Sequence, residues 1–581
     1  MRLTYLKLIL IYLVPLIFYA QERQQIQIEY APYMTFEPSK PDATILTRDN
    51  SNQVHIKHNG IEMWCNEAIY YDKQDFIEAY GSVRVKQGDS LDMTSKYVEY
   101  SGKTQLAYAS GDVVLIDPTS KLHTDILYFD RIKQQAFYNQ KGRVVRDTSG
   151  TITSTIGHYY MNSKKYQFTD NVKLVNPEYV IDTDRLDFYT VSGYAFLYGP
   201  TTITSDTSII YCERGFYNTN NDTGYFVKNS KIDYDERTII GDSLYFDRNK
   251  NFASATNNIK VTDTLNNNII KGHYAEVFRA KDSVFITKRA LAITKQENDS
   301  IFIHSDTLMI TGPPDKRIVR AFYNAKMYKS DLSGKADSIH MNQNTGLTQL
   351  INFYDTDSED TFSKRRHPVL WHHENQITGD SIHLISNPKT ESLDSLKVFE
   401  NAFVISKDSL GAGYNQISGK KLDGLFKENE LHTIDVIKNA ESIYFLRNAD
   451  NELVGIDKSK SGKMRILVSE NKINELQKIN QIDGKTYPED DFPENQRILK
   501  GFVWRKTERP RSVEDLFSED PPLELPAIKG LGVHSPQAAF FDKSLENRVE
   551  AAGKPSKESK GKLSNNKAGR KIPKNISEAK K

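Results

Sequence analysis

The stretch IIGDSLYFDRNKNFASATNNIKVTD, residues 239–263, contains a short pattern that the chain repeats. The pattern opens with an aspartate and continues with apolar residues at alternate positions. It raises one question, because a repeated aspartate could be a catalytic group, a metal ligand or a structural turn. The seven copies begin at Asp89, Asp125, Asp184, Asp242, Asp306, Asp337 and Asp380.

Apolar residues follow each of these aspartates at the second and fourth positions, and the third position is mostly polar or amphipathic. A period of two predicts a β-strand that buries one face. The residues two places on are Leu91, Leu127, Leu186, Leu244, Leu308, Ile339 and Ile382. The residues four places on are Met93, Phe129, Phe188, Phe246, Ile310, Met341 and Leu384.

A longer period is superimposed on the strand pattern. Asp125, Asp184 and Asp242 are spaced by 59 and 58 residues. Short strands with Gly, Asn and Asp at their joins lie between them. A unit of this size cannot bury its apolar face alone, whereas stacked units can. The sequence therefore predicts an all-β fold, an elongated repetitive array of antiparallel strands.

The repeated aspartate is best explained as a structural turn before each strand, where an aspartate side chain can bond the backbone. Catalysis needs one local constellation of groups, and seven equivalent carboxylates do not form one. The Gly-rich nonapeptides of calcium-binding β-helices are absent. We therefore predict no enzyme activity, no cofactor and no metal site.

The segment HPVLWHHENQITGD contains His367, His372 and His373, the one histidine group that suggests a metal. Adjacent histidines on a strand point to opposite faces, so a loop leading into the next strand is the better interpretation. Cys65 and Cys212 are the only cysteines, and whether they pair is left open by the sequence.

The first residues, MRLTYLKLILIYLVPLIFYAQ, place two basic residues before a short apolar run and a small residue at position 20. This order is typical of a secretory signal peptide. The run is short for a membrane span. We therefore expect export to the periplasm, with cleavage near residue 20.

The stretch CNEAIYYDKQDFIEAYGSVRVKQGDSLDMTSKYVEY and the serial strands that follow it resemble the OstA-like (organic solvent tolerance) family of lipopolysaccharide transport. The resemblance covers about residues 45–440. A second stretch, which begins GKMRILVSENKINELQKINQIDGKTYPEDDF, is similar to the C-terminal part of long Bacteroidetes-type members.

The resemblance implies a taco-shaped β-jellyroll, open along one side, whose apolar groove holds acyl chains. It also implies a periplasmic bridge that carries lipopolysaccharide or a related glycolipid and pairs through its edge strands with other transport proteins. Because each buried methylene contributes about 0.8 kcal/mol, such a groove could hold a lipid. The expected lining residues are Leu91, Met93, Leu127, Phe129, Leu186, Phe188, Leu244, Phe246, Leu308 and Ile310.

Two alternatives stay open at this point. The inward residues could simply fill a closed core, and the protein could be an exported scaffold or adhesin that binds protein or glycan on its outer face. The length allows one long array or two consecutive jellyrolls. The expected parts are a signal peptide (1–20), a linker (21–44), two jellyroll halves (45–235 and 236–440), a C-terminal β extension (441–520) and a tail (521–581).

The end of the chain differs in composition. From residue 551 it holds ten Lys and Arg against two Glu and has few apolar residues. This composition predicts a disordered basic tail. Such a tail solubilises a protein or attracts it to an anionic membrane surface. The net charge of the whole chain is +1, which offers no argument for nucleic-acid binding.

Overall fold

The computed structural model describes residues 25–531, with gaps at 90, 147–149, 235, 266, 296–298, 314–315, 353–366, 391, 409, 449 and 470–471. The predicted signal peptide and most of the predicted basic tail lie outside the described residues. The chain divides into two units, Met1–Lys529 and Gly530–Lys581. All described strands belong to the first unit.

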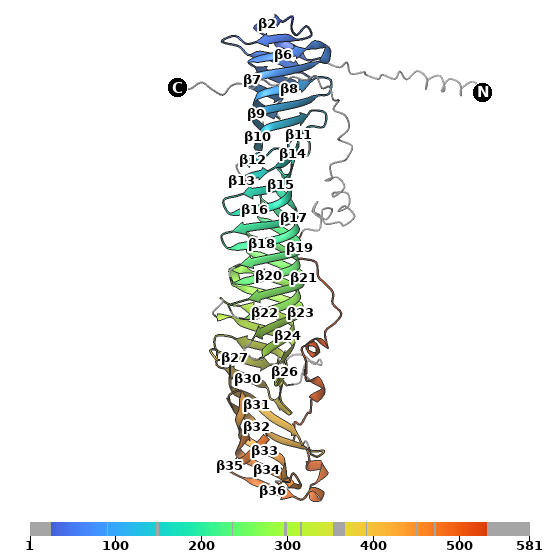
Figure 1. The fold of residues 1–581 in the computed structure, drawn as a ribbon. Coiled ribbons are helices and arrows are strands. Elements are labelled where there is room, and N and C mark those ends of the chain that lie inside the picture. Colours follow the sequence, from blue (N-terminus) through green and yellow to red (C-terminus); the bar gives the residue numbers. More distant parts are fainter. Residues whose placement is uncertain are drawn as a thin grey trace, which may run out of the picture. The chain divides into compact units, whose positions relative to one another are not determined.

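The predicted all-β fold is confirmed, and within the described residues the strands form one antiparallel sheet without an α-helix. Figure 1 shows the strands following one another in chain order. The first strands are β1 (Gln27–Tyr30), β2 (Tyr33–Phe36), β3 (Thr44–Thr47), β4 (Val54–His58), β5 (Ile61–Cys65), β6 (Glu67–Tyr71), β7 (Phe76–Gln87), β8 (Leu91–Ser101), β9 (Leu106–Asp117), β10 (Ser120–Asp130), β11 (Gln135–Tyr138), β12 (Gly142–Arg146), β13 (Gly150–Ser154) and β14 (Ile156–Tyr160).

Regular strands of similar length then follow as hairpins. These are β15 (Lys165–Val175), β16 (Tyr179–Tyr189), β17 (Tyr194–Ser205), β18 (Ser208–Asn218), β19 (Thr223–Tyr234), β20 (Arg237–Asp247), β21 (Phe252–Asp263), β22 (Asn268–Phe278), β23 (Ser283–Lys295), β24 (Ser300–Thr311), β25 (Ile318–Tyr328) and β26 (Leu332–Asn342). The remaining strands are β27 (Leu347–Ile351), β28 (Val369–His372), β29 (Asn375–Thr378), β30 (Ser381–Ser386), β31 (Leu393–Lys407), β32 (Tyr414–Lys427), β33 (Glu430–Arg447), β34 (Leu453–Ser469), β35 (Lys472–Ile479) and β36 (Asp483–Tyr487).

Each long strand is interrupted in its middle by a bulge, where the pairing register shifts. Between β19 and β20, for example, the shift falls between Val227 and Ser230, and Lys228 and Asn229 both have positive φ. Such bulge positions recur every 29 residues, at 170, 199, 228 and 257. Because a bulge bends a strand, each strand contributes one half to each of two facing layers. The true repeat is therefore one bent hairpin, half the predicted 58-residue unit.

We name the two layers leaf A and leaf B. Leaf A contains the strand halves 113–117, 120–124, 142–146, 179–183, 201–205, 230–234, 237–241, 259–263, 300–305, 325–328 and 332–336. Leaf B contains the halves 126–130, 156–160, 165–169, 185–189, 223–227, 243–247, 252–256, 274–278 and 307–311. The bulges form the bend, and the hairpin turns form two rims that face each other as the mouth.

The shared aspartates lie mostly at the bend, so the prediction of a turn before each strand is wrong for all but Asp89 and Asp380, which precede β8 and β30. Asp242, for example, lies inside β20 and accepts hydrogen bonds from the side-chain amides of Asn257 (2.7 Å) and Asn258 (2.9 Å). Asn324 donates in the same way to Asp306 at 2.9 Å. The apolar alternation changes phase at some bulges, which makes one bent strand resemble a turn followed by a new strand.

The space between the leaves holds the core, which divides into two clusters. One cluster runs from Ile26 to Phe226 and the other from Leu244 to Val468. The sheet itself continues between them through the pairing of β19 with β20. The chain is therefore one continuous sheet with an interrupted core.

Strands continue only to Tyr487, so the expected β extension over 441–520 ends earlier than its predicted boundary. Residues 488–529, which we call the strap, contain several prolines and short 3-10 helices instead of ladder-forming residues. The 3-10 helices within the described residues are η1 (Asp72–Gln74), η2 (Arg279–Lys281), η5 (Glu489–Asp491), η6 (Glu494–Gln496), η7 (Lys506–Glu508) and η8 (Glu514–Phe517). Within the described residues, none of the helices has the length and apolar character needed to span a bilayer.

Candidate functional site: an apolar cavity between the leaves

A cavity of about 430 Å³ lies between the leaves where the two core clusters separate. Strands β16 to β24 contribute its walls, and most of the wall side chains are apolar. Its volume falls in the range of about 300–1,000 Å³ that is usual for small-molecule sites. Apolar residues on its walls include Ile203, Ile210, Ile232, Ile239, Leu244, Phe246, Val261, Ile270, Val277, Val284 and Ile310.

Small side chains create this space. Along one inward row of neighbouring strands, Phe226 pairs with Leu244, but the next two positions are Ala255 and Ala275. The row regains bulk at Ile286, which pairs with Ala275. Because the leaves are held apart by larger residues on either side, the alanines leave a gap that is not filled.

The inward residues beside the cavity are less buried than those elsewhere. Phe168 and Phe188 in the first cluster are fully buried, with 0% exposure. Ile232, Ile239 and Val261 are partly exposed although they face inward. The interior therefore opens at this level and is sealed on the N-terminal side of it.

Hydrogen bonds between the rims close the mouth over the first cluster. The Ser120 and Tyr166 hydroxyls lie 2.8 Å apart across the two leaves. Arg146 donates from leaf A to the carbonyl oxygen of Thr190 on the leaf B rim at 2.8 Å. The core beneath these bonds contains Leu186 and Phe188, both fully buried.

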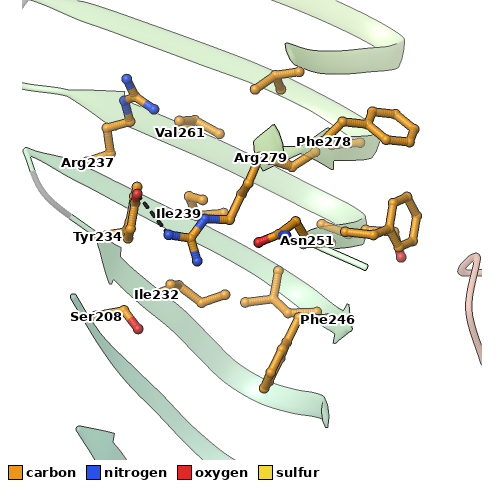
Figure 2. A pocket seen from close by; sticks show the side chains of 18 of the residues that line it. Ser208, Ile232, Tyr234, Arg237, Ile239, Phe246, Asn251, Val261, Phe278 and Arg279 are labelled. Atoms are coloured by element: carbon orange, nitrogen blue, oxygen red, sulfur yellow. Dashed lines mark hydrogen bonds between the residues drawn. The ribbon is translucent and has the colours of Figure 1, made fainter. Parts of the chain in front are cut away.

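Arginines surround the mouth of the cavity. Arg279 on the leaf B rim donates to the Tyr234 hydroxyl on leaf A at 2.9 Å, and Ile232, Ile239 and Phe246 lie near this pair in Figure 2. Arg317 forms an ion pair with the buried Asp263 across the same mouth. An apolar interior with a cationic rim suits an amphiphile with an anionic head group.

Two phenols of the cavity wall stay protonated at neutral pH. Burial raises the pKa of both Tyr179 and Tyr217, whose rings are 4.9 Å apart. Tyr217 donates its hydroxyl proton to Asp222 at 2.8 Å. These phenols therefore act as neutral hydrogen-bonding groups at the cavity edge.

The expected groove-lining residues all face the interior, but they divide among three surroundings. Leu244, Phe246 and Ile310 line the large cavity. Leu91, Met93, Leu127 and Phe129 line a second space of about 30 Å³. Leu186, Phe188 and Leu308 are fully buried core residues.

Sequence reasoning missed the residues that distinguish the cavity from the core. Ala253 and Ala255 stand within the quoted stretch, but their small size carries meaning only beside the bulkier residues of the preceding hairpin. Arg279 and Arg317 follow strands in turns, and nothing in the local pattern places them at one mouth. A 29-residue alignment of the hairpins would have revealed the alanines.

The other candidates for chemistry do not assemble. Among the described residues, no three His, Cys, Asp or Glu side chains gather as a metal site. His367 pairs with Asp380 at 3.1 Å, whereas His372 is buried against His373. Cys65 and Cys212 are buried free thiols, and burial raises the pKa of each to about 12.

Comparison with known families gives a match for residues 23–184, to the model described as OstA-like protein. The chain carries an OstA-like region. The match ends within β16, but the bent hairpins continue with the same register shifts to β34. The matched region is thus followed by further copies of the same bent hairpin.

No relative was found among curated proteins. One matching solved structure is the crystal structure of LptH, the LptA homologous periplasmic component of the conserved lipopolysaccharide transport device from Pseudomonas aeruginosa. It is 13% identical, and the match covers 23% of this chain and 92% of that chain with a TM-score of 0.20.

Proposed function

We propose that this OstA-like protein is a periplasmic lipid-binding bridge that carries lipopolysaccharide or a related glycolipid between its two leaves. The observation that supports this most is the apolar cavity of about 430 Å³ beside a rim of arginines. Acyl chains would leave water for the cavity, at about 0.8 kcal/mol per methylene. Carrying a lipid in this way needs no covalent step.

The head group would stay at the mouth. Arg279 contacts the hydroxyl of Tyr234, and its charge can also attract a phosphate or carboxylate. Arg237 lies 3.6 Å from Asp263, a carboxylate that it shares with Arg317. An anionic head group would compete with Asp263 for the guanidinium groups of Arg237 and Arg317.

Partners would dock on the ends of the sheet. Among the described residues, β2 pairs only with β3, and its Tyr33, Met34 and Phe36 are 60%, 51% and 70% exposed. An exposed apolar edge strand is a template for strand addition. This supports edge pairing with other lipopolysaccharide-transport proteins. The basic tail would add attraction to an anionic membrane surface.

Site-specific photo-crosslinking to extracted lipopolysaccharide tests the lipid site. Ile239 and Ile240 are neighbours in β20 with identical side chains, but Ile239 lines the cavity and Ile240 is 40% exposed on the outer face. A photoreactive amino acid at 239 should crosslink to the lipid, and one at 240 should not. Ala255→Leu, which fills the cavity, should reduce the crosslink from 239 several-fold.

Two outcomes would contradict the proposal. Equal crosslinking from 239 and 240 would indicate nonspecific adsorption. Crosslinks from 240 alone would favour the scaffold or adhesin that binds glycan on its outer face. The circular dichroism of each variant should match the wild type, so that a lost crosslink is not a lost fold.

A further inference from the structure

The strap, residues 488–529, packs on the outside of the sheet and returns along it to the level of β20 and β21 (Figure 1). Its first part covers an apolar cluster on the outer face of β31 and β33. Phe492 and Leu499 are buried there against Phe403, Ile443 and Phe445. The C-terminal segment of the chain therefore covers part of an outer face that is elsewhere exposed to solvent.

Two glutamine side chains hold the strap backbone in this part. Gln416 accepts from the Leu499 N–H and donates to the Arg497 carbonyl oxygen, both at 2.8 Å. Gln376 accepts from the Arg505 N–H and donates to the Val503 carbonyl oxygen, both at 2.7 Å. Each glutamine amide therefore makes the two backbone hydrogen bonds that a neighbouring strand would otherwise make with this part of the strap.

The upper part of the strap packs near the bend. Leu516 is fully buried, and the Phe517 ring lies 4.6 Å from the ring of His304. Asp520 contacts His304 Nε2 at 2.8 Å. Glu519 bonds Lys335 at 2.8 Å. All these contacts are on the outer face of leaf A, within a few residues of the bulges.

Nine residues later the strap is attached to the other leaf. The carbonyl oxygen of Lys529 accepts from the Ser254 hydroxyl at 2.7 Å, and its ammonium group bonds Glu276 at 2.9 Å. Ser254 and Glu276 lie on leaf B, on strands that line the cavity. The link between the two attachments, residues 521–528, contains Pro521, Pro522 and Pro526 and can span at most about 30 Å.

We propose that the strap is an external brace that holds the two leaves apart at the level of the cavity. The rim bonds oppose opening of the mouth, but they do not oppose its closing. Apolar walls beside an unfilled space tend to close on it, because closing removes apolar surface from water. A stiff link fixed to both outer faces resists the change of angle that closing requires.

This inference goes beyond the proposed function, because it concerns the shape of the cavity in the absence of any lipid. Its test is the distance across the mouth in the full chain. Leu265 and Lys281 are exposed in the turns that follow β21 and β22, on opposite rims. Both would be changed to cysteine and spin-labelled, since native Cys65 and Cys212 are 0% exposed.

Leu516→Asp places a charge in a buried position and should release the upper strap. Hydrogen exchange of residues 513–529 should then accelerate at least tenfold, and the distance between the labels should become shorter and more broadly distributed. The control is Gln416→Ala. It should accelerate exchange only near residues 497–499 and leave the label distance unchanged.

A second variant, Lys529→Ala combined with Ser254→Ala, removes both bonds of the leaf B attachment and leaves the apolar core intact. It should shift the distance in the same direction as Leu516→Asp. The proposal is overturned if either variant releases the strap without changing the distance. It is also overturned if the upper strap exchanges as slowly in both variants as in the wild type, because its anchors would then lie elsewhere.

Discussion

At the scale of single residues, Asp242 joins the bend of β20 to the bend of β21. Its carboxylate accepts from two neighbouring asparagine amides, and both asparagines have positive φ. Asparagine tolerates that conformation better than most residues. The bulge therefore explains the aspartate at this position. Its carboxylate accepts the side-chain hydrogen bonds of the two asparagines that adopt positive φ.

Replacement of Asp242 by Ala should lower the free energy of unfolding by about 1 kcal/mol, since it removes hydrogen bonds at a partly solvated site. Asp242→Asn keeps one acceptor oxygen and should lose less. Urea denaturation of both variants measures the difference. A loss of several kcal/mol, or a loss of lipid binding with unchanged stability, would point to a specific role for this carboxylate.

His372 should make stability depend on pH. Burial, followed by the charge of His373, lowers the pKa of His372 to about 4, whereas an unfolded histidine titrates near 6.5. Between these values the unfolded chain binds the proton and the folded chain does not, so stability falls as pH falls from 6.5 toward 4. The contribution is on the order of 3 kcal/mol.

Urea denaturation of the wild type and of His372→Leu between pH 7.5 and pH 4 measures this contribution. The wild type should lose more stability than the variant over that range, because only the wild type carries this imidazole. Parallel losses in the two proteins would show that His372 does not carry the dependence.

At the scale of elements, the strands were predictable and their bends were not. Leu186 and Phe188 alternate with polar residues, and alternation is a local signal. A bulge leaves no consistent signal: the apolar phase is unchanged across it in β15, where Phe168 and Val172 are buried, but it shifts in β16 between Thr183 and Leu186. The bend is visible only in the pairing register. Where β19 pairs with β20, for example, the register shifts between Val227 and Ser230.

The strap could not be predicted as a packed element for a related reason. Its contacts join residues that are far apart in the sequence, such as Gln416 with Leu499. Its apolar residues, among them Leu516 and Phe517, follow no strand or helix period. Such a segment becomes ordered by the surface that it covers, and that surface exists only after the hairpins have stacked.

At the scale of the whole molecule, the cavity is accessible to a lipid and the sealed core of the first cluster is not. A lipid could enter the cavity at β19 to β22 without moving the leaves. To travel along the sheet it must pass the first cluster, where Phe188 is fully buried and Tyr166 bonds Ser120 across the mouth. Transport therefore requires the leaves to separate there for a time, whereas simple binding does not.

Crosslinking at Phe188 separates these two possibilities. In the wild type, a photoreactive residue at 188 should capture lipopolysaccharide less often than one at 239. Tyr166→Phe keeps the ring and removes the hydroxyl that bonds Ser120, so it should weaken the closed mouth with little effect on packing. Capture at 188 should then rise several-fold, while capture at 239 stays unchanged. If 239 captures lipid and 188 captures none even with Tyr166→Phe, the cavity is a resident binding site and the groove is not a path.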